Sequence, residues 1–526
     1  MLIGYVSDER YVALPDCLLE FVSNAGSWEA RSRATGAVHA DLPPGEYRVT
    51  LFKAGFGAKS VQLRIEPGMP PYHFRLLSDC LLGYVWPKCV KAGERGEFRV
   101  HSVEAYKLEL WRYGWKKELV KVLGWFDEHG PRATMQITPD GDYTQTGVGW
   151  NKQGYNMKVH NQYVEAPAES GLYYFHASTR GGARFAFPWV VAPERPRQPL
   201  AVLASNITWN AYNSFGGRSN YIHATTFPPT PTINSRQDLF RYTDPDHIFY
   251  DREDYDPLSF DRPEPFNNIE PGEQITDLLE SRTACHLAPA EWRLLGWLER
   301  EGFAFDLYGE TQLHSGDLKL DDYRVLLIST HPEYWSRQMY LEVKDWVQKR
   351  GGKLIYLGGN GLNCEVEFND SQPMTDRHGN LREILAKQHA SRLPPRLERE
   401  ANLLGVVFTE AGAMTGAPFR VVDDSHWAFA NTGLKNGDIF GEHSIHMRCP
   451  GGASGHETDK VSPSSPANVH KVAKGLNKDD GGADMIVYDT PSGGQVFSAS
   501  SITWPCSVVV DAHVSAITAN VLRKFL

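Results

Sequence analysis

The residues whose types could support catalysis lie directly after two apolar segments in the second half of the chain. Residues 323–330 (YRVLLIST) run into His331 and Glu333, and residues 353–357 (KLIYL) run into a Gly-Gly-Asn-Gly turn that contains Asn360. A histidine and a carboxylate can transfer a proton, and a side-chain amide can donate a hydrogen bond to an oxyanion. A carboxylate before a helix is also favoured by the helix dipole, and asparagine tolerates tight turns. The spacing alone therefore favours neither the catalytic nor the structural explanation.

A second group of candidate residues is Tyr212 and Tyr221, on either side of a Gly216-Gly217 turn. Without other information, such tyrosines are more often packing residues than ligands. A tyrosine binds a metal only as a phenolate, and because its ordinary pKa is near ~10, a strong Lewis acid such as ferric iron must displace the proton. Two phenolates and one carboxylate would carry three negative charges, which match a hard trivalent ion better than zinc or copper.

The pattern around these residues predicts a parallel α/β sheet. Strands are expected at 199–206, 323–330 and 353–359, and amphipathic helices at 289–303 and 336–352. Alternating strands and helices with short connections are typical of parallel sheets. Such sheets bind their ligands at the carboxyl ends of the strands, which is where both polar turns lie.

The N-terminal part of the chain has a different pattern, in which short alternating strands are separated by turn signals. We expect a small β-sandwich over residues 1–76, similar to the regulatory-type β domains beside carboxypeptidases. An immunoglobulin-like β domain is expected over residues 77–194. The proline-rich segment 192–199 (APERPRQP) marks the boundary with the catalytic α/β domain, residues 195–526.

Composition argues against several classes of function. The 526 residues carry a formal net charge of −10 and no run of Lys or Arg stands out, so nucleic acid is not an expected partner. The N-terminal segment lacks the basic and apolar regions of a signal peptide, and no run of about eighteen apolar residues predicts a membrane span. The 7 cysteines are widely spaced without a Cys-x-x-Cys motif, which favours a reducing, cytoplasmic location over a disulfide framework.

Several short motifs occur in the order in which they occur in one known enzyme family. The motifs are TWNAYNSFGG with SNY (208–221), SFDRP (259–263), WLEREGF (297–303), HPEYWS (331–336), GGNG (358–361), Gly455-His456-Glu457, and FSASSITWP (497–505) with NVLRKF (520–525). Together they resemble the large (beta) subunit of N,N-dimethylformamidase and its shorter relatives, over roughly residues 195–526.

The resemblance implies a mononuclear Fe(III) amidohydrolase with a fold related to class I glutamine amidotransferases. It implies two tyrosines and one glutamate as metal ligands, which correspond to Tyr212, Tyr221 and Glu333 in this sequence. Tyr250 and Tyr255 remain alternatives to Tyr221, because the spacing varies in the family. The resemblance also implies four residues that line the pocket, namely His331, Asn360, Glu457 and, in its apolar wall, Phe497.

The expected reaction is hydrolysis of the C–N bond of a small amide by metal-activated water. Either His331 or Glu457 could be the base, and Asn360 could donate a hydrogen bond to the oxyanion. The acidic, aromatic segment between Tyr221 and Ser259 departs strongly from the family. The substrate therefore need not be dimethylformamide, and a larger amide or formamide fits equally well.

The sequence leaves partners and two other functions open. We expect a homo-oligomer. Because the chain is shorter than the large subunit of the family, the small accessory subunit of that enzyme could be absent here, and the sequence leaves open whether one is required. One alternative function is a hydrolase of the same fold with another metal or substrate class. The other is a non-catalytic binding protein built from the same domains.

Overall fold

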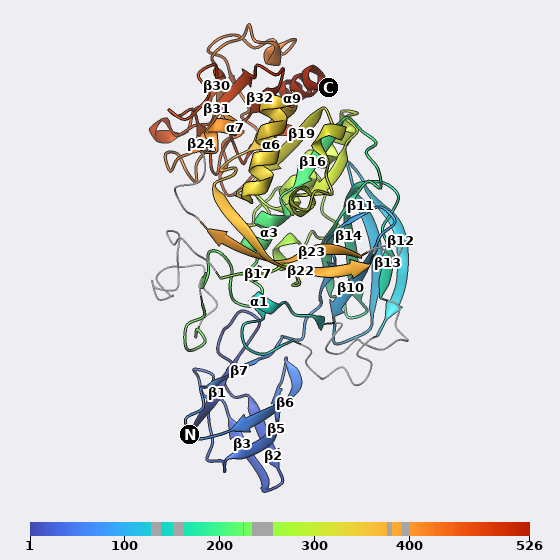
Figure 1. The fold of residues 1–526 in the computed structure, drawn as a ribbon, viewed down its shortest axis with the longest axis vertical. Coiled ribbons are helices and arrows are strands. Elements are labelled where there is room, and N and C mark those ends of the chain that lie inside the picture. The colour runs from blue at the N-terminus through green and yellow to red at the C-terminus, as the bar shows by residue number, and fades with distance from the viewer. Residues whose placement is uncertain (128–137, 151–161, 225, 234–255, 376–380, 392–398) are drawn as a thin grey trace.

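The computed structural model of the protein describes residues 1–127, 138–150, 162–224, 226–233, 256–375, 381–391 and 399–526. The molecule is elongated (Figure 1): a group of N-terminal strands lies at one end, and the C-terminal part lies at the other. It is a β-rich, multidomain protein with several separate sheets and few helices.

Strands β1 to β7 form two sheets at the N-terminal end of the molecule, with the orders β4-β1-β7 and β3-β2-β5-β6. Alternate residues of β5, namely Tyr47, Val49 and Leu51, are buried, as expected for a sheet with one covered face. The strands are β1 (Leu2–Ser7), β2 (Leu18–Ser23), β3 (Gly26–Arg31), β4 (Ala37–His39), β5 (Gly45–Lys53), β6 (Gly57–Ile65) and β7 (Tyr72–Arg75).

The next strands form two further sheets, with the orders β13-β10-β8 and β12-β11-β14-β15-β9. Their apolar side chains, among them Phe98, Phe175 and Trp189, share one buried cluster. The elements are β8 (Leu82–Trp86), β9 (Cys89–Lys91), β10 (Arg95–His101), β11 (Tyr106–Tyr113), β12 (Lys117–Phe126), α1 (Tyr143–Thr146), β13 (Tyr163–Glu165), β14 (Gly171–Thr179) and β15 (Arg184–Ala192).

A nine-stranded mixed sheet, with the order β18-β16-β19-β21-β32-β31-β30-β26-β27, dominates the C-terminal part. Its first five strands are parallel. These are β18 (Asp306–Gly309), β16 (Leu200–Ala204), β19 (Val325–Thr330), β21 (Lys353–Gly358) and β32 (Gln495–Ser498). The antiparallel remainder consists of β31 (Asp484–Asp489), β30 (His470–Gly475), β26 (Phe419–Val421) and β27 (Ile439–Phe440).

The sequence predicts β16, β19 and β21 correctly, since each is a continuous apolar run. It does not predict the short strands β18, β26, β27 and β32. Strands of two to four residues, such as β26 and β27, are too short to show a period.

The two predicted helices are confirmed as α4 (Ala288–Arg300) and α6 (Arg337–Lys349). Ser336 caps α6, because its side chain accepts a hydrogen bond from the Met339 N–H at 3.3 Å. The other helices are α3 (Asn206–Tyr212), α5 (Glu310–His314), α7 (Ala401–Leu404), α8 (Trp504–Val508) and α9 (Ala512–Phe525).

A long hairpin and several short elements complete the C-terminal part. The hairpin pairs β22 (Cys364–Thr375) with β23 (Leu381–Ser391) and is flanked by β20 (Tyr334–Trp335) and β17 (Leu258–Ser259). The short strands are β24 (Val407–Phe408), β25 (Gly416–Ala417), β28 (Ser454–Gly455) and β29 (Asp459–Lys460), and the 3-10 helices are η4 (Pro265–Asn267), η5 (Leu320–Asp322), η6 (Trp427–Phe429) and η7 (Lys478–Asp480).

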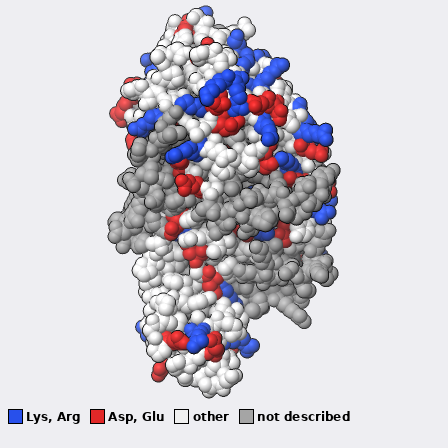
Figure 2. Space-filling view, in the orientation of Figure 1, with Lys and Arg blue, Asp and Glu red and all other residues white. Residues whose placement is uncertain are grey.

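On the face shown in Figure 2, basic and acidic side chains lie next to each other rather than in separate fields. Among the helices of the described residues, none combines the length and apolar character needed to cross a membrane.

Candidate active site

Glu333 lies in the turn between β19 and β20, at the carboxyl end of the parallel strands. Thr330 has a φ of +61°, which turns the chain out of the sheet. The Glu333 N–H donates to the His331 carbonyl at 2.9 Å and to Thr208 Oγ1 of α3 at 3.1 Å. The side chain is buried, and the capping of α6 is provided by Ser336 instead. Helix capping therefore does not explain the carboxylate of Glu333.

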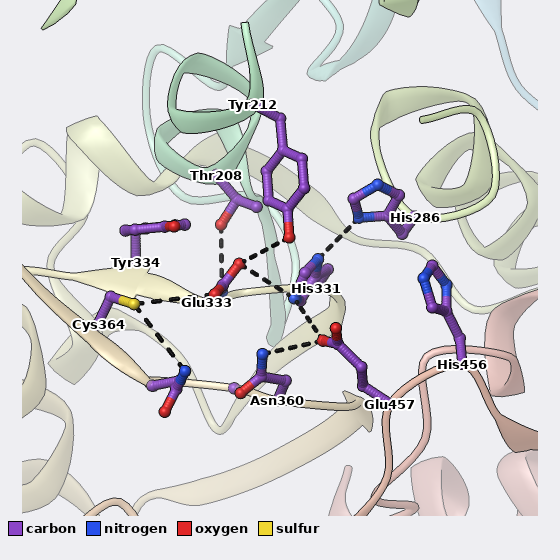
Figure 3. Close-up of polar contacts among 12 residues, drawn as sticks. Thr208, Tyr212, His286, His331, Glu333, Tyr334, Asn360, Cys364, His456 and Glu457 are labelled. Carbon is purple, nitrogen blue, oxygen red and sulfur yellow. Dashed lines mark hydrogen bonds and ion pairs between the residues drawn. The ribbon is translucent and has the colours of Figure 1, made fainter. Parts of the chain in front are cut away.

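Two phenols meet the same oxygen of this carboxylate. Tyr212 Oη donates to Glu333 Oε2 at 3.0 Å, and Tyr221 Oη donates to the same atom at 2.7 Å. The centroids of the two rings lie 4.3 Å apart. In Figure 3, the Tyr212 side chain points from α3 toward Glu333. Burial and the charge of Glu333 raise the pKa of Tyr212 well above its ordinary value. A phenolate at this position therefore needs a neighbouring cation.

His331 and Glu457 form a second polar pair beside Glu333 (Figure 3). His331 Nε2 lies 3.2 Å from Glu457 Oε2 and 3.3 Å from Glu333 Oε2. Burial alone would lower the pKa of His331, but the charges of Glu333 and Glu457 outweigh burial and raise it. Burial alone would raise the pKa of Glu457, but the charge of the His331 ring beside it outweighs burial and lowers it. Both shifts favour an imidazolium–carboxylate pair.

Asn360 contacts the same oxygen of Glu457 as His331. Its Nδ2 donates to Glu457 Oε2 at 2.9 Å, and its backbone N–H donates to Asp459 Oδ1 at 2.8 Å. The preceding Gly359 allows this approach, since a Cβ there would lie 2.2 Å from the Glu457 carbonyl oxygen. The Gly-Gly-Asn-Gly turn thus brings the chain after β21 against the segment that carries Glu457.

Buried arginines hold the loop that carries Tyr221. Arg75, Arg218 and Arg262 are each fully buried. Arg262 Nη1 donates to the carbonyls of Asn213 (3.2 Å) and Phe215 (2.7 Å). Arg218 Nη1 donates to the Ala224 carbonyl at 2.9 Å, and Arg75 Nη2 donates to the Gly216 carbonyl at 2.8 Å. Because Arg75 belongs to β7, the N-terminal strands help to position the second phenol.

The structure brings together six of the predicted site residues, and Phe497 is not among them. Tyr212, Tyr221, Glu333, His331, Glu457 and Asn360 form the contacts given above. Phe497 lies within β32, paired with Ile355 of β21 and Val487 of β31, and is fully buried in the core of the sheet. Tyr250 and Tyr255 lie outside the described residues.

The sequence reasoning misses three residues that touch the cluster. Thr208 contacts the Glu333 backbone, Cys364 Sγ lies 3.8 Å from Glu333 Oε1, and His286 Nδ1 lies 2.8 Å from His331 Nδ1. Burial and the neighbouring histidines hold the pKa of His286 well below its usual value, so its ring is neutral. His286 comes just before α4, where no spacing relates it to His331.

The chemistry of the donors decides whether a metal fits. In the described ranges, no three side chains of His, Cys, Asp or Glu are grouped as a metal site. Tyr212, Tyr221 and Glu333 offer three oxygen donors around one point, and such a hard, anionic set suits a trivalent ion.

Two solved structures are similar to parts of the chain. One is a β-galactosidase from Rahnella sp. R3, with 11% identity and a TM-score of 0.26 over 45% of this chain and 27% of that chain. Another is a ThuA-like protein from Bacteroides uniformis, with 13% identity and a TM-score of 0.27 over 46% of this chain and 87% of that chain.

Two curated relatives are each named N,N-dimethylformamidase beta subunit, one from Alcaligenes sp. and one from Paracoccus aminophilus. Each is 27% identical to this chain over 285 residues. The match covers 45% of this chain and only 37% of either relative. A family described as "N,N-dimethylformamidase beta subunit-like, C-terminal" matches residues 107–515, which is most of the chain. The chain therefore belongs to the N,N-dimethylformamidase beta subunit-like family.

Proposed function

We propose that the protein is a mononuclear iron-dependent amidohydrolase that cleaves the C–N bond of a small amide or formamide. The observation that carries this proposal is the convergence of Tyr212 and Tyr221 on one oxygen of Glu333. The names of the curated relatives support the same reaction class. We also propose that the parallel strands with α4 and α6 form a domain of the class I glutamine amidotransferase type, within residues 195–526, behind β domains at 1–76 and 77–194.

Tyr212, Tyr221 and Glu333 would hold the iron. Loss of both phenolic protons gives this set three negative charges, which a ferric ion balances. A bound ferric ion supplies Lewis acidity, which polarises a carbonyl and lowers the pKa of water.

The remaining polar residues have distinct tasks in the proposed reaction. Glu457 is the base that takes a proton from the attacking water, since the charge of His331 beside it keeps the carboxylate ionised. His331, as an imidazolium, donates a proton to the leaving amine and recovers it from Glu457. Asn360 Nδ2 donates one of its two protons to Glu457. Its second proton is the donor for the carbonyl oxygen of the substrate.

The relatives are named as beta subunits. We propose that this chain also assembles with other chains, either as a homo-oligomer or together with an accessory small subunit. The substrate in this proposal is a small amide, with formamides and larger amides as the first compounds to compare.

The experiment that tests the proposal compares the purified full-length protein with two glutamate variants. Elemental analysis should find about one iron per chain, and a tyrosinate-to-iron charge-transfer band should colour the protein. Formamides, N-alkyl amides and ureas should be screened for amine release. Glu333→Ala should lose iron, colour and activity, whereas Glu342→Ala, which changes an exposed glutamate of α6, should keep all three.

A colourless wild-type protein that binds no iron and releases no amine would contradict the proposal and favour a binding protein. A different metal, together with hydrolysis, would favour the hydrolase with another metal instead. Retention of iron by Glu333→Ala would reject this ligand set.

A further inference from the structure

His286 is a buried histidine that the proposed reaction does not use. It directly precedes Leu287, the N-cap of α4, and it is 1% exposed. Its Nδ1 lies 2.8 Å from His331 Nδ1, as the dashed line in Figure 3 marks. Its ring also packs edge-on against Tyr212, with 4.6 Å between centroids and an interplanar angle of 79°. His286 thus contacts His331 and Tyr212 but does not face either carboxylate.

Only one proton can lie between the two Nδ1 atoms. His331 Nε2 faces Glu333 and Glu457, so in the proposed reaction His331 transfers its proton at Nε2. A histidine that gives or takes a proton at Nε2 without becoming an anion must keep its other proton on Nδ1. The Nδ1 of His286 is then the acceptor of that proton, and His286 carries its own proton on Nε2. This arrangement resembles the general case in which a third group orients a catalytic histidine.

Packing alone does not explain a histidine at this position. His286 Nε2 is buried and has no hydrogen-bond partner within the described part of the chain. A buried polar atom without a partner costs free energy that an apolar side chain of similar size avoids. The bond to His331 is therefore the interaction that distinguishes histidine from leucine here.

A backbone turn and a contact between α3 and α4 set the position of His286. The His286 and Leu287 N–H groups donate to the Thr283 carbonyl at 3.2 and 3.1 Å, so the chain before α4 is a closed turn. In the first turn of α4, Glu291 accepts a hydrogen bond from Trp209 Nε1 at 2.8 Å. Since Trp209 is on α3, this bond couples α4 to the helix that carries Tyr212. The position of His286 relative to the cluster is thus set by two helices.

We propose that His286 is a positioning residue that accepts the Nδ1–H of His331 and so holds His331 with Nε2 toward Glu333 and Glu457. Its effect on turnover rests on the proposed function, whereas its effect on the ring of His331 does not. Without the acceptor, the His331 ring is free to rotate about Cβ–Cγ, which exchanges Nδ1 with Cδ2 and Nε2 with Cε1 and so turns Nε2 away from the two carboxylates.

The test compares His286→Leu with His286→Asn. Leucine removes the acceptor, whereas the asparagine Oδ1 can accept the same proton. His176→Leu is the control, because His176 of β14 is similarly buried and its Nε2 lies 2.7 Å from the Tyr113 hydroxyl rather than from a residue of the cluster. Crystal structures give the orientation of His331, and kinetics with the best amide give kcat and KM separately.

His286→Leu should turn or disorder the His331 ring and lower kcat about 10–100-fold, with KM within about threefold of wild type. Iron content should be unchanged. His286→Asn should keep the ring in place and restore most of kcat, and His176→Leu should match wild type. If the leucine variant does not fold, His286→Phe removes the acceptor and keeps a ring beside Tyr212.

An unmoved His331 ring in a folded His286→Leu protein would overturn the inference, whatever the activity. An equal loss of kcat in the leucine and asparagine variants would do so too, because it would indicate packing rather than a hydrogen bond. If wild type binds no iron and hydrolyses no amide, the proposed function fails, but the position of the ring still decides the role of His286.

Discussion

The phenolic oxygen of Tyr221 lies 2.7 Å from Oε2 of Glu333, although 112 positions of the chain separate the two residues. Glu333 is buried, and a buried carboxylate is stable only when its charge is paired or hydrogen-bonded. The Tyr221 hydroxyl is therefore a partner that this carboxylate needs. Replacing the phenolic proton by a cation at the same point preserves the pairing of the charge.

The first prediction concerns Tyr221→Phe. Phenylalanine keeps the ring that packs against Tyr212 but lacks the donor oxygen. Iron affinity should fall at least about 10-fold, and the charge-transfer band should weaken as one phenolate is lost. Iron content after dialysis against a chelator and the visible spectrum measure both effects.

The matched control for Tyr221→Phe is Tyr334→Phe. The Tyr334 hydroxyl lies 2.8 Å from Tyr221 Oη, so its loss changes the surroundings of the phenol without removing a donor. This variant should keep its iron and its band. If Tyr221→Phe also keeps both, the second ligand is Tyr250 or Tyr255, and their Phe variants become decisive.

The second prediction concerns Glu457→Gln. Glutamine keeps the size of the side chain and an oxygen for Asn360, but it cannot accept a proton from water. We expect kcat to fall about 10²–10⁴-fold, the range of a general base, with unchanged iron content. Steady-state kinetics and elemental analysis check this pair of results. Loss of iron in step with activity would show that Glu457 binds the metal instead of acting as the base.

Part of the site could be predicted from local sequence because it depends on local geometry. The apolar run of β19 followed by His331 and Glu333 indicates a strand that ends in polar groups. Asn360 after β21 follows the same logic. Since the carboxyl ends of parallel strands meet at one edge of a sheet, their proximity follows from the fold class.

The contacts between distant segments could not be predicted from spacing. The assignment of Tyr221 came from the resemblance to a family and not from periodicity. His286 stands in the turn before α4, and Arg75 reaches the Tyr221 loop from β7. No local pattern marks such residues, because each is defined by a partner at least 45 positions away.

The third prediction concerns Arg75, which links the N-terminal strands to the Tyr221 loop. Its guanidinium donates to the carbonyls of Asp8 (3.0 Å), Gly141 (3.0 Å) and Gly216 (2.8 Å). Arg75→Met keeps the length of the side chain but leaves these buried acceptors without their donor, at a cost of about 1–3 kcal/mol each. The thermal midpoint should fall, and iron affinity should fall with it because the loop loses a support.

The control for Arg75→Met is Arg64→Met, at a position 70% exposed in β6. An exposed substitution of this kind should change the free energy of unfolding by no more than about 0.5 kcal/mol. Equal midpoints for the two variants, with equal iron contents, would show that the N-terminal strands do not support the Tyr221 loop.

The fourth prediction concerns the pH dependence of stability and Glu291. Burial raises the pKa of Glu291 from 4.5 to about 8, against the hydrogen bonds from Trp209 and Ser205. Between pH 4.5 and 8 the folded protein keeps a proton that the unfolded chain has released. The contribution of this group is therefore fully present below pH 4.5 and is lost as pH rises to 8, by about 1.4 kcal/mol per pH unit.

Glu291→Gln stays neutral and keeps an acceptor for Trp209, so it should gain stability over wild type as pH rises. Denaturant unfolding from pH 5 to 9 should show this divergence, and Glu66→Gln, at a site 54% exposed, should follow wild type. Parallel curves for wild type and Glu291→Gln would mean that Glu291 is ionised in the folded protein, with its charge balanced by its surroundings.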